Sequence, residues 1–226
     1  KNNNQLLDYF ENTGHPFAAI TLDSMRWINN DFHAILKINP GSLYKIDSIH
    51  VLGKVKIKQN FLQHYLRIAN GSFYNKQPLD QISQRISELP FLQQTQPWQL
   101  SMLTGGATVH LFLEPKRSSQ VYVLLGLAPA NQQLGGTKLL LTGEANINLK
   151  NALGAGETIG INWQQLQYKS PRINLQFQYP YIFKSAFGSD IGFELFKKDS
   201  QWVNINARIG ILYELSAKQS GKDRKS

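Results

Sequence analysis

A long run of alternating apolar and polar residues in the second half of the chain most constrains its fold. Residues 172–181, "RINLQFQYPY", put polar Arg172, Asn174 and Gln176 on one face and apolar Ile173, Leu175, Phe177 and Tyr179 on the other. The side chains of a strand point alternately to its two faces, so the pattern predicts a strand with faces of opposite polarity. The pattern recurs in 201–215, where Asn204, Asn206 and Arg208 share the polar face. From about residue 118 the chain predicts six strands, near 120–128, 137–150, 157–168, 171–183, 189–198 and 201–215.

Alternation alone fits a soluble sheet with one wet face as well as a membrane strand between lipid and a water-filled lumen. Several of the segments exceed the roughly five or six residues of an ordinary strand and match the about ten of a membrane barrel strand. Only 17% of the residues are charged, which suits a polar but weakly charged lumen. Aromatic residues typical of a membrane interface occur at Trp163, Tyr168, Tyr179, Tyr181 and Trp202. We therefore favour the membrane, with 173–179 supplying the lipid face; a soluble β-sandwich remains the alternative.

The first half mixes helical and strand periods. Residues 3–13 predict the end of a helix, and 17–41 predict two strands joined near 29–31. Residues 43–117 predict the order strand, helix, helix, strand, strand, with Pro78 in the first turn of the second helix and a hairpin turn at 104–106. This order defines one α+β module. Residues 1–42 are interpreted as the back end of another.

These segments together resemble a known family. "YKIDSIHVLG…FLQHYLRIANGSFYNKQPLDQISQRISELPF" resembles a POTRA domain of the BamA/TamA family of outer-membrane proteins, and "ENTGHPFAAI" is similar to part of an upstream one. "GEANINLKNALGAGETIGINW" and "LQFQYPYIF" are similar to the early barrel strands of that family. The resemblance implies α+β POTRA modules (β-α-α-β-β) followed by antiparallel transmembrane β-barrel strands. It divides the chain into the C-terminal part of a preceding POTRA domain (1–42), the last POTRA domain (43–117) and the first six or so barrel strands (118–226).

The chain departs from the family in one respect. It contains no Val/Ile-Arg-Gly-Phe type motif and no final strand with a terminal aromatic residue. The smallest membrane barrels use eight strands, so six leave backbone groups unpaired in lipid. We therefore expect 118–226 to be the front part of a longer barrel.

The resemblance implies an outer-membrane protein whose N-terminal part is periplasmic and which assembles or inserts other β-barrel proteins. The implied partners are unfolded β-barrel client polypeptides, periplasmic or lipoprotein accessory subunits, and outer-membrane lipids. An incoming strand would pair with the edge of the first barrel strand, the candidate gate strand, comprising Val121, Tyr122, Val123, Leu124, Leu125 and Gly126. A further free edge for a client or subunit is expected in the module at Trp98, Gln99, Leu100 and Ser101. The alternative functions are a transporter of the same superfamily that secretes one dedicated polypeptide, and a soluble two-domain binding protein in which 118–226 forms a sandwich.

No pattern of residues predicts enzymatic chemistry. The chain has no cysteine, and its five histidines lack metal-ligand spacing. The "GAGETIG" segment has no P-loop lysine and precedes a strand, so we interpret it as a hairpin turn. Asp190 and Glu194 share a strand face, which lumen polarity explains. These observations together lead us to expect no enzyme, no cofactor and no metal. The net charge of +9 lies partly in the tail 218–226 and forms no basic stripe, so we expect no nucleic-acid partner.

Overall fold

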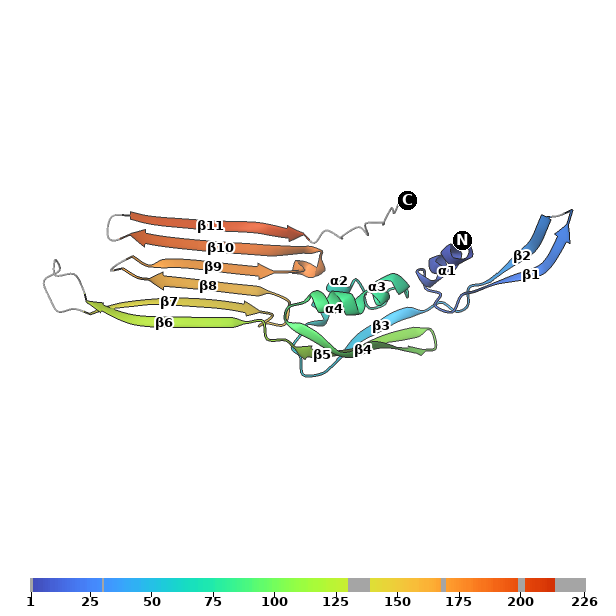
Figure 1. Cartoon of the computed structure of the whole chain (residues 1–226), viewed down its shortest axis with the longest axis horizontal. Coiled ribbons are helices and arrows are strands. Elements are labelled where there is room, and N and C mark those ends of the chain that lie inside the picture. The colour runs from blue at the N-terminus through green and yellow to red at the C-terminus, as the bar shows by residue number, and fades with distance from the viewer. Residues whose placement is uncertain (1, 30, 130–138, 168–169, 199–201, 214–226) are drawn as a thin grey trace. The chain divides into compact units, whose positions relative to one another are not determined.

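The computed structural model describes residues 2–29, 31–129, 139–167, 170–198 and 202–213 (Figure 1). The chain divides into two compact units, residues 1–117 and residues 118–226, which are described separately below. Tyr168, the basic tail and the outer ends of the expected strands at 137–150 and 201–215 lie outside the described residues. None of the described helices is long and apolar enough to span a membrane.

Residues 45–115 form a small α+β module. Its elements are β3 (Lys45–Leu52), α2 (Gln59–Leu66), α3 (Lys76–Asp80), α4 (Ile82–Glu88), β4 (Leu92–Leu103) and β5 (Gly106–Pro115). The sheet order is β3-β5-β4, in which β5 pairs parallel with β3 and antiparallel with β4. The expected second helix is divided at Gln81, and the first ends earlier than expected. Arg67, in a left-handed conformation, caps the carbonyls of Gln63 and His64, which ends α2 before Asn70.

The core of the module lies between the helices and one face of this sheet. The helices and the sheet each contribute aliphatic side chains that are at most 2% exposed: Ile46, Ile49, Leu62, Leu66, Leu79, Ile82, Ile86, Leu92, Val109, Leu111 and Leu113. Each such side chain stabilises the fold by about 1.5–3 kcal/mol relative to its exposed state. The backbone approaches closely at Gly53 (φ +125°), where an added Cβ would lie 2.0 Å from the carbonyl oxygen of Leu113.

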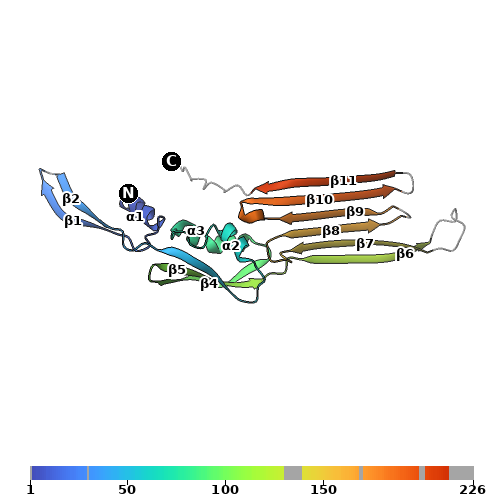
Figure 2. The same ribbon diagram turned by 180° about the vertical axis from the view of Figure 1, so that it is seen from behind.

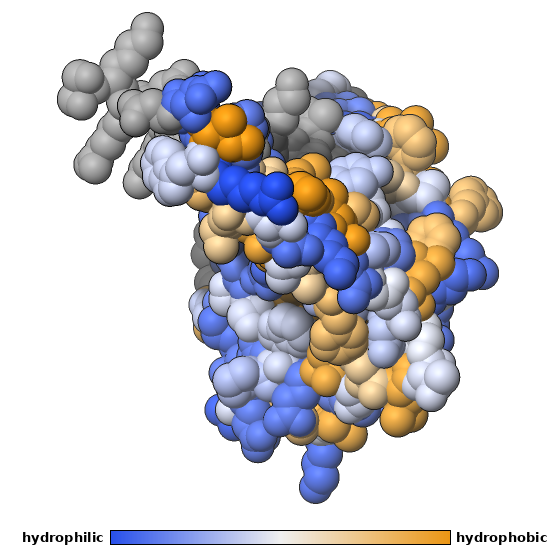
Figure 3. All heavy atoms as spheres, turned by 90° about the vertical axis from the view of Figure 1, so that its right-hand side faces the viewer, coloured by the Kyte–Doolittle hydropathy of each residue, from blue (hydrophilic) through white to orange (hydrophobic). Residues whose placement is uncertain are grey.

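The N-terminal segment contains α1 (Asn2–Glu11) and an antiparallel hairpin of β1 (Ala19–Ile28) and β2 (Asp31–Asn39). Its large apolar side chains are exposed, as at Trp27 (75%) and Ile35 (62%). Figure 3 shows the molecule from the right-hand side of Figure 1, and apolar residues are visible on the surface that faces the viewer. A two-stranded hairpin alone is marginally stable in water. The interpretation of 1–42 as the C-terminal part of a preceding POTRA domain stays a prediction.

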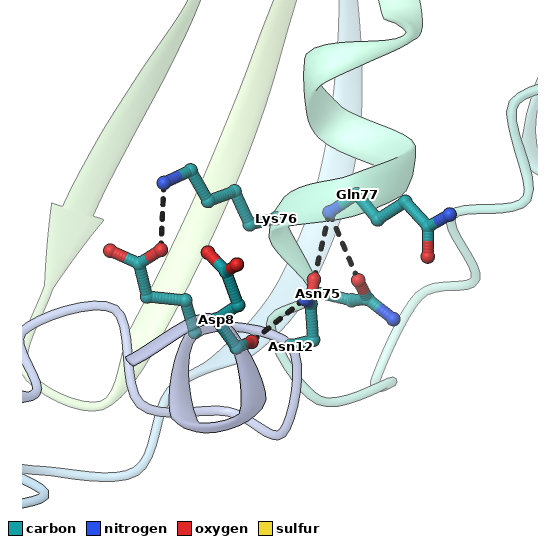
Figure 4. Close-up of polar contacts among 6 residues, drawn as sticks. Asp8, Asn12, Asn75, Lys76 and Gln77 are labelled. Atoms are coloured by element: carbon teal, nitrogen blue, oxygen red, sulfur yellow. Dashed lines mark hydrogen bonds and ion pairs between the residues drawn. The ribbon is translucent and has the colours of Figure 1, made fainter. Parts of the chain in front are cut away.

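Hydrogen bonds connect the end of α1 to the start of α3 (Figure 4). Lys76 Nζ lies 2.7 Å from Glu11 Oε2, and the Gln77 amide donates to Asn12 Oδ1 at 3.0 Å. The hydrogen bond to Glu11 raises the pKa of Lys76. Burial, followed by the charge of Glu11, raises the pKa of Tyr74. This polar contact joins the N-terminal segment to the module.

Residues 120–213 contain the six expected strands in a single sheet: β6 (Gln120–Pro129), β7 (Leu139–Lys150), β8 (Thr158–Gln165), β9 (Arg172–Tyr179), β10 (Phe187–Lys198) and β11 (Trp202–Tyr213). Each strand pairs antiparallel with the next, so the order is β11-β10-β9-β8-β7-β6, seen from both sides in Figures 1 and 2. The prediction of an antiparallel sheet is confirmed. Among the described residues it forms one layer rather than the two of a sandwich, and β6 and β11 do not pair with each other.

The expected strand over 171–183 is wrong at its end, because β9 stops at Tyr179. Pro180 has no N–H to donate to the neighbouring strand, and Tyr181 adopts a left-handed conformation with φ +53°. Tyr181 therefore lies in the turn before β10 and is not part of the apolar strand face.

Candidate functional site

The six-stranded sheet keeps one mainly polar and one mainly apolar face across all of its strands, because the register contains no bulge. Side chains directly opposite each other on paired strands lie on the same face. One row of the polar face runs Tyr122, Asn146, Asn162, Asn174, Glu194 and Asn206. The next runs Gln120, Asn148, Gly160, Gln176, Gly192 and Arg208. These two rows of the polar face are therefore lined mainly by amides and glycine, and neighbouring rows of the same face add charges such as Glu144, Lys150 and Arg172.

The opposite face is mainly apolar, and its rows alternate along the strands with those of the polar face. One row runs Val121, Ile147, Ile161, Leu175, Phe193 and Ala207. Side chains of this face at the two outer strands are largely exposed, as at Val123 (54%), Ile205 (61%) and Ile209 (85%). A contiguous exposed apolar face of this kind marks an interaction surface or contact with a membrane.

The structure places the residues of the two sequence-predicted faces as follows. Ile173, Leu175, Phe177 and Tyr179 share the apolar face, and Arg172, Asn174, Gln176, Asn204, Asn206 and Arg208 share the polar face. Their contact with lipid or lumen water stays a prediction. Trp202, expected among the interface aromatics, lies opposite Lys198 on the polar face, with its ring 5.4 Å from that of Phe196.

Charges on the polar face are held next to one another. Arg208 Nη2 lies 3.9 Å from Asp190 Oδ2, and the Arg172 guanidinium lies 4.8 Å from the ring centroid of Phe196. A shallow depression of about 330 Å³ opens beside Arg172 and Phe196, and its lining consists of Arg172, Ile173, Asn174, Glu194, Leu195, Phe196, Asn204 and Asn206. Asp190 and Glu194 thus belong to a surface of amides and arginines, which can hold an extended polar chain or water.

The turn between β7 and β8 is organised around a fully buried carboxylate, that of Glu157. The amides of Leu153 and Ala155 donate to its two oxygens, the second at 3.0 Å. The Asn151 side chain accepts from the Gly156 amide at 2.9 Å, while Gly154 and Gly156 have positive φ. The amides that a phosphate would need are thus occupied by an internal anion. The hairpin interpretation holds, but sequence reasoning missed Glu157, which the adjacent Gly-x-Gly segment could have indicated.

Both candidate edges lie at the margins of their sheets. The gate strand, Val121 to Gly126, lies on β6, whose one partner among the described strands is β7. The candidate module edge, Trp98 to Ser101, lies on β4, whose one described strand partner is β5. Register shifts occur on both sides of Gln96, and Pro97 lacks an N–H. Since bulges and proline protect edges, the regular stretch from Gln99 to Leu103 is the better template for an added strand.

The structure brings together two histidines that are far apart in the sequence. His50 and His110 are directly opposite on β3 and β5, with ring centroids 5.6 Å apart, and His110 Nε2 lies 3.0 Å from Ser101 Oγ. Among the described residues no group of three or more histidine, aspartate or glutamate side chains could hold a metal ion. This cluster therefore supplies two imidazoles and a hydroxyl on the outer face of the module.

No family model and no curated protein matches the chain in sequence. Its fold is similar to that of the crystal structure of BamA from Haemophilus ducreyi lacking POTRA domains 1-3, with a TM-score of 0.51 and 16% identity over 88% of this chain and 36% of that one. CdiB from Acinetobacter baumannii matches with a TM-score of 0.45, 15% identity, and 86% and 34% coverage. CdiB from Escherichia coli matches with a TM-score of 0.44 and 15% identity, over 88% of this chain and 37% of that one. The chain thus spans about a third of the length of the structures that it matches, and the likeness to BamA is one of fold.

Proposed function

We propose that residues 118–226 are the first strands of an outer-membrane β-barrel and that residues 43–117 are a periplasmic POTRA domain. The single observation that carries the barrel assignment is the unbroken register, which gives six strands in one layer a mainly polar and a mainly apolar face. The order strand, helices, strand, strand of the module supports the POTRA assignment. In water the apolar face would need a second layer, whereas lipid covers it directly. Four of the six strands, β6, β7, β10 and β11, have 10 or 12 residues and match the about ten tilted residues that cross the apolar band of a bilayer, whereas β8 and β9 have 8 each.

The activity that we propose is assembly of β-barrel client polypeptides at the edge of β6. A strand entering lipid must have its backbone donors and acceptors paired, and the outer side of β6 provides a strand-length template for them. The likeness of fold to BamA supports this activity. Lipids, unfolded clients and accessory subunits are the proposed partners, and no step requires a cofactor.

Photocrosslinking tests the gate assignment. A photoreactive residue at Val121 of the full-length protein is expected to crosslink to a nascent barrel substrate. Ile161 is the matched control, because it lies in the same apolar row but on β8, which has β7 and β9 on its two sides. Equal crosslinking from both positions, or none from Val121 in a functional protein, contradicts the gate.

The continuous polar face supports secretion of a dedicated polypeptide through the lumen as the second candidate. Its amides and its charges of both signs can solvate an extended chain without binding it tightly. Depletion of the protein separates the two candidates. An assembly factor lowers many outer-membrane proteins together, whereas a dedicated transporter removes one partner from the cell surface and leaves the others unchanged.

A further inference from the structure

The turn between β9 and β10 has an unusual backbone. Tyr181, Phe183 and Lys184 all adopt left-handed conformations, with φ of 53°, 53° and 59°. A side chain with a Cβ rarely adopts this conformation, and an aromatic ring makes it less favourable still. The Ser185 amide and hydroxyl both donate to the Ile182 carbonyl, at 3.0 and 2.7 Å, and close the turn. Residues in this conformation cluster at functional sites, so the turn is a candidate for one.

The effect of this backbone is to expose Phe183. Its side chain is 97% exposed, the highest value among the large apolar residues of the described chain. The following residue, Lys184, is exposed as well. An aromatic ring held in water gains free energy when an apolar medium covers it. The turn therefore presents one aromatic ring and one cation together.

The turn lies next to an aromatic row at one end of the apolar face. This row comprises Phe187 and Tyr213, directly opposite each other on β10 and β11 with their ring centroids 5.2 Å apart. Tyr179 lies on the same face one pair further along, opposite Ser189. The same end of the sheet contains Gln120, where β6 begins and where the chain enters from residue 117. If the module is periplasmic, as proposed above, this end faces the periplasmic leaflet.

We propose that the β9–β10 turn is a lipid anchor, in which Phe183 inserts its ring into the headgroup region of the periplasmic leaflet. Aromatic residues flank the apolar band of membrane barrels at both interfaces, and the wholly apolar ring of Phe183 gains free energy when lipid covers it. Lys184 adds attraction to the phosphates of anionic lipids. The aromatic row continues the same contact along the sheet. This inference deepens the proposed membrane location of the sheet and rests on it.

These 226 residues contain no cysteine, and any cysteine elsewhere in the full-length protein is first replaced by serine. Single cysteines replace Phe183, Leu175 or Leu103 in the full-length protein and carry an environment-sensitive fluorophore. Leu175 reports the middle of the apolar face, and Leu103, 80% exposed in the β4–β5 hairpin, reports water. The labelled proteins are reconstituted alone into vesicles of phosphatidylethanolamine and phosphatidylglycerol that contain lipids brominated either near the headgroup or deep in the acyl chain.

We expect headgroup-proximal bromine to quench the label at 183 most strongly, deep bromine to quench the label at 175, and neither to quench the label at 103. Quenching at 175 without quenching at 183 overturns the anchor but leaves the membrane sheet intact. Absence of quenching at 175 overturns the membrane location and this inference with it. As a second measurement, Phe183→Ser should lower the equilibrium for insertion into these vesicles roughly tenfold, and Phe183→Trp should preserve it. Equal insertion of both variants contradicts the anchor.

Discussion

Replacing Glu157 tests whether the β7–β8 turn depends on its internal carboxylate. The side chain is fully buried, and each of its oxygens accepts a backbone hydrogen bond, from Leu153 and from Ala155. Hydrogen bonds to a charged group stabilise a fold by about 1.5–3 kcal/mol each. Glu157→Gln retains one acceptor and places an N–H opposite another N–H. We expect it to lower the free energy of unfolding by about 1.5–3 kcal/mol.

Glu157→Ala removes both acceptors and should cost about 3–5 kcal/mol, because two buried amides lose their partners. Unfolding by urea of the protein in detergent micelles measures both changes. Hydrogen exchange adds a local measurement, since the amides of Leu153 and Ala155 should exchange faster in either variant. Glu144→Gln is the matched control, because Glu144 lies within β7 opposite Gln164, and it should change stability by less than about 0.5 kcal/mol.

A Glu157→Gln variant that unfolds like the Glu144→Gln control and leaves the exchange of both amides unchanged contradicts this role of the carboxylate. Such a result would mean that glycine and Asn151 determine the turn without the carboxylate. Loss of stability without faster exchange at Leu153 and Ala155 would also refute it, because the effect would then originate outside the turn.

Three further changes test the two units. Leu175→Lys should destabilise the membrane-inserted sheet by about 2–4 kcal/mol and Asn174→Lys by less than about 1 kcal/mol, as measured by unfolding from vesicles; equal effects contradict the face assignment. Gly53→Ala should cost the module about 2–4 kcal/mol through its clash and its positive φ, whereas Gly71→Ala, with positive φ but open space, should cost about 1 kcal/mol in thermal unfolding. Burial and then nearby carboxylates raise the pKa of Tyr74, so the folded state favours its protonated form. The contribution of Tyr74 to the stability of the module is therefore expected to be complete below the ordinary pKa of 10.0 and to be lost as the pH rises above it. Tyr74→Phe should weaken this loss of stability, as measured by unfolding followed by fluorescence over a series of pH values.

Alternation of residue types determined much of the sheet without any tertiary information. Because side chains alternate along every strand, the sequence "RINLQF" by itself assigns Asn174 and Leu175 to opposite faces. Proline and glycine placed the turns for similarly local reasons. The exception, Tyr181, shows the limit of alternation: its residue type continues the apolar pattern, but Pro180 ends the ladder one residue earlier.

Only the tertiary structure decided which residues meet across strands. The row that joins Tyr122 to Asn206 depends on five strand pairings, and a shift of one residue in any of them would exchange the faces. The approach of His50 and His110 depends on a parallel pairing across the helices, which no local pattern encodes. The burial of Glu157 and the exposure of Phe183 depend on how each turn closes in space, because residue type gives the opposite expectation for both.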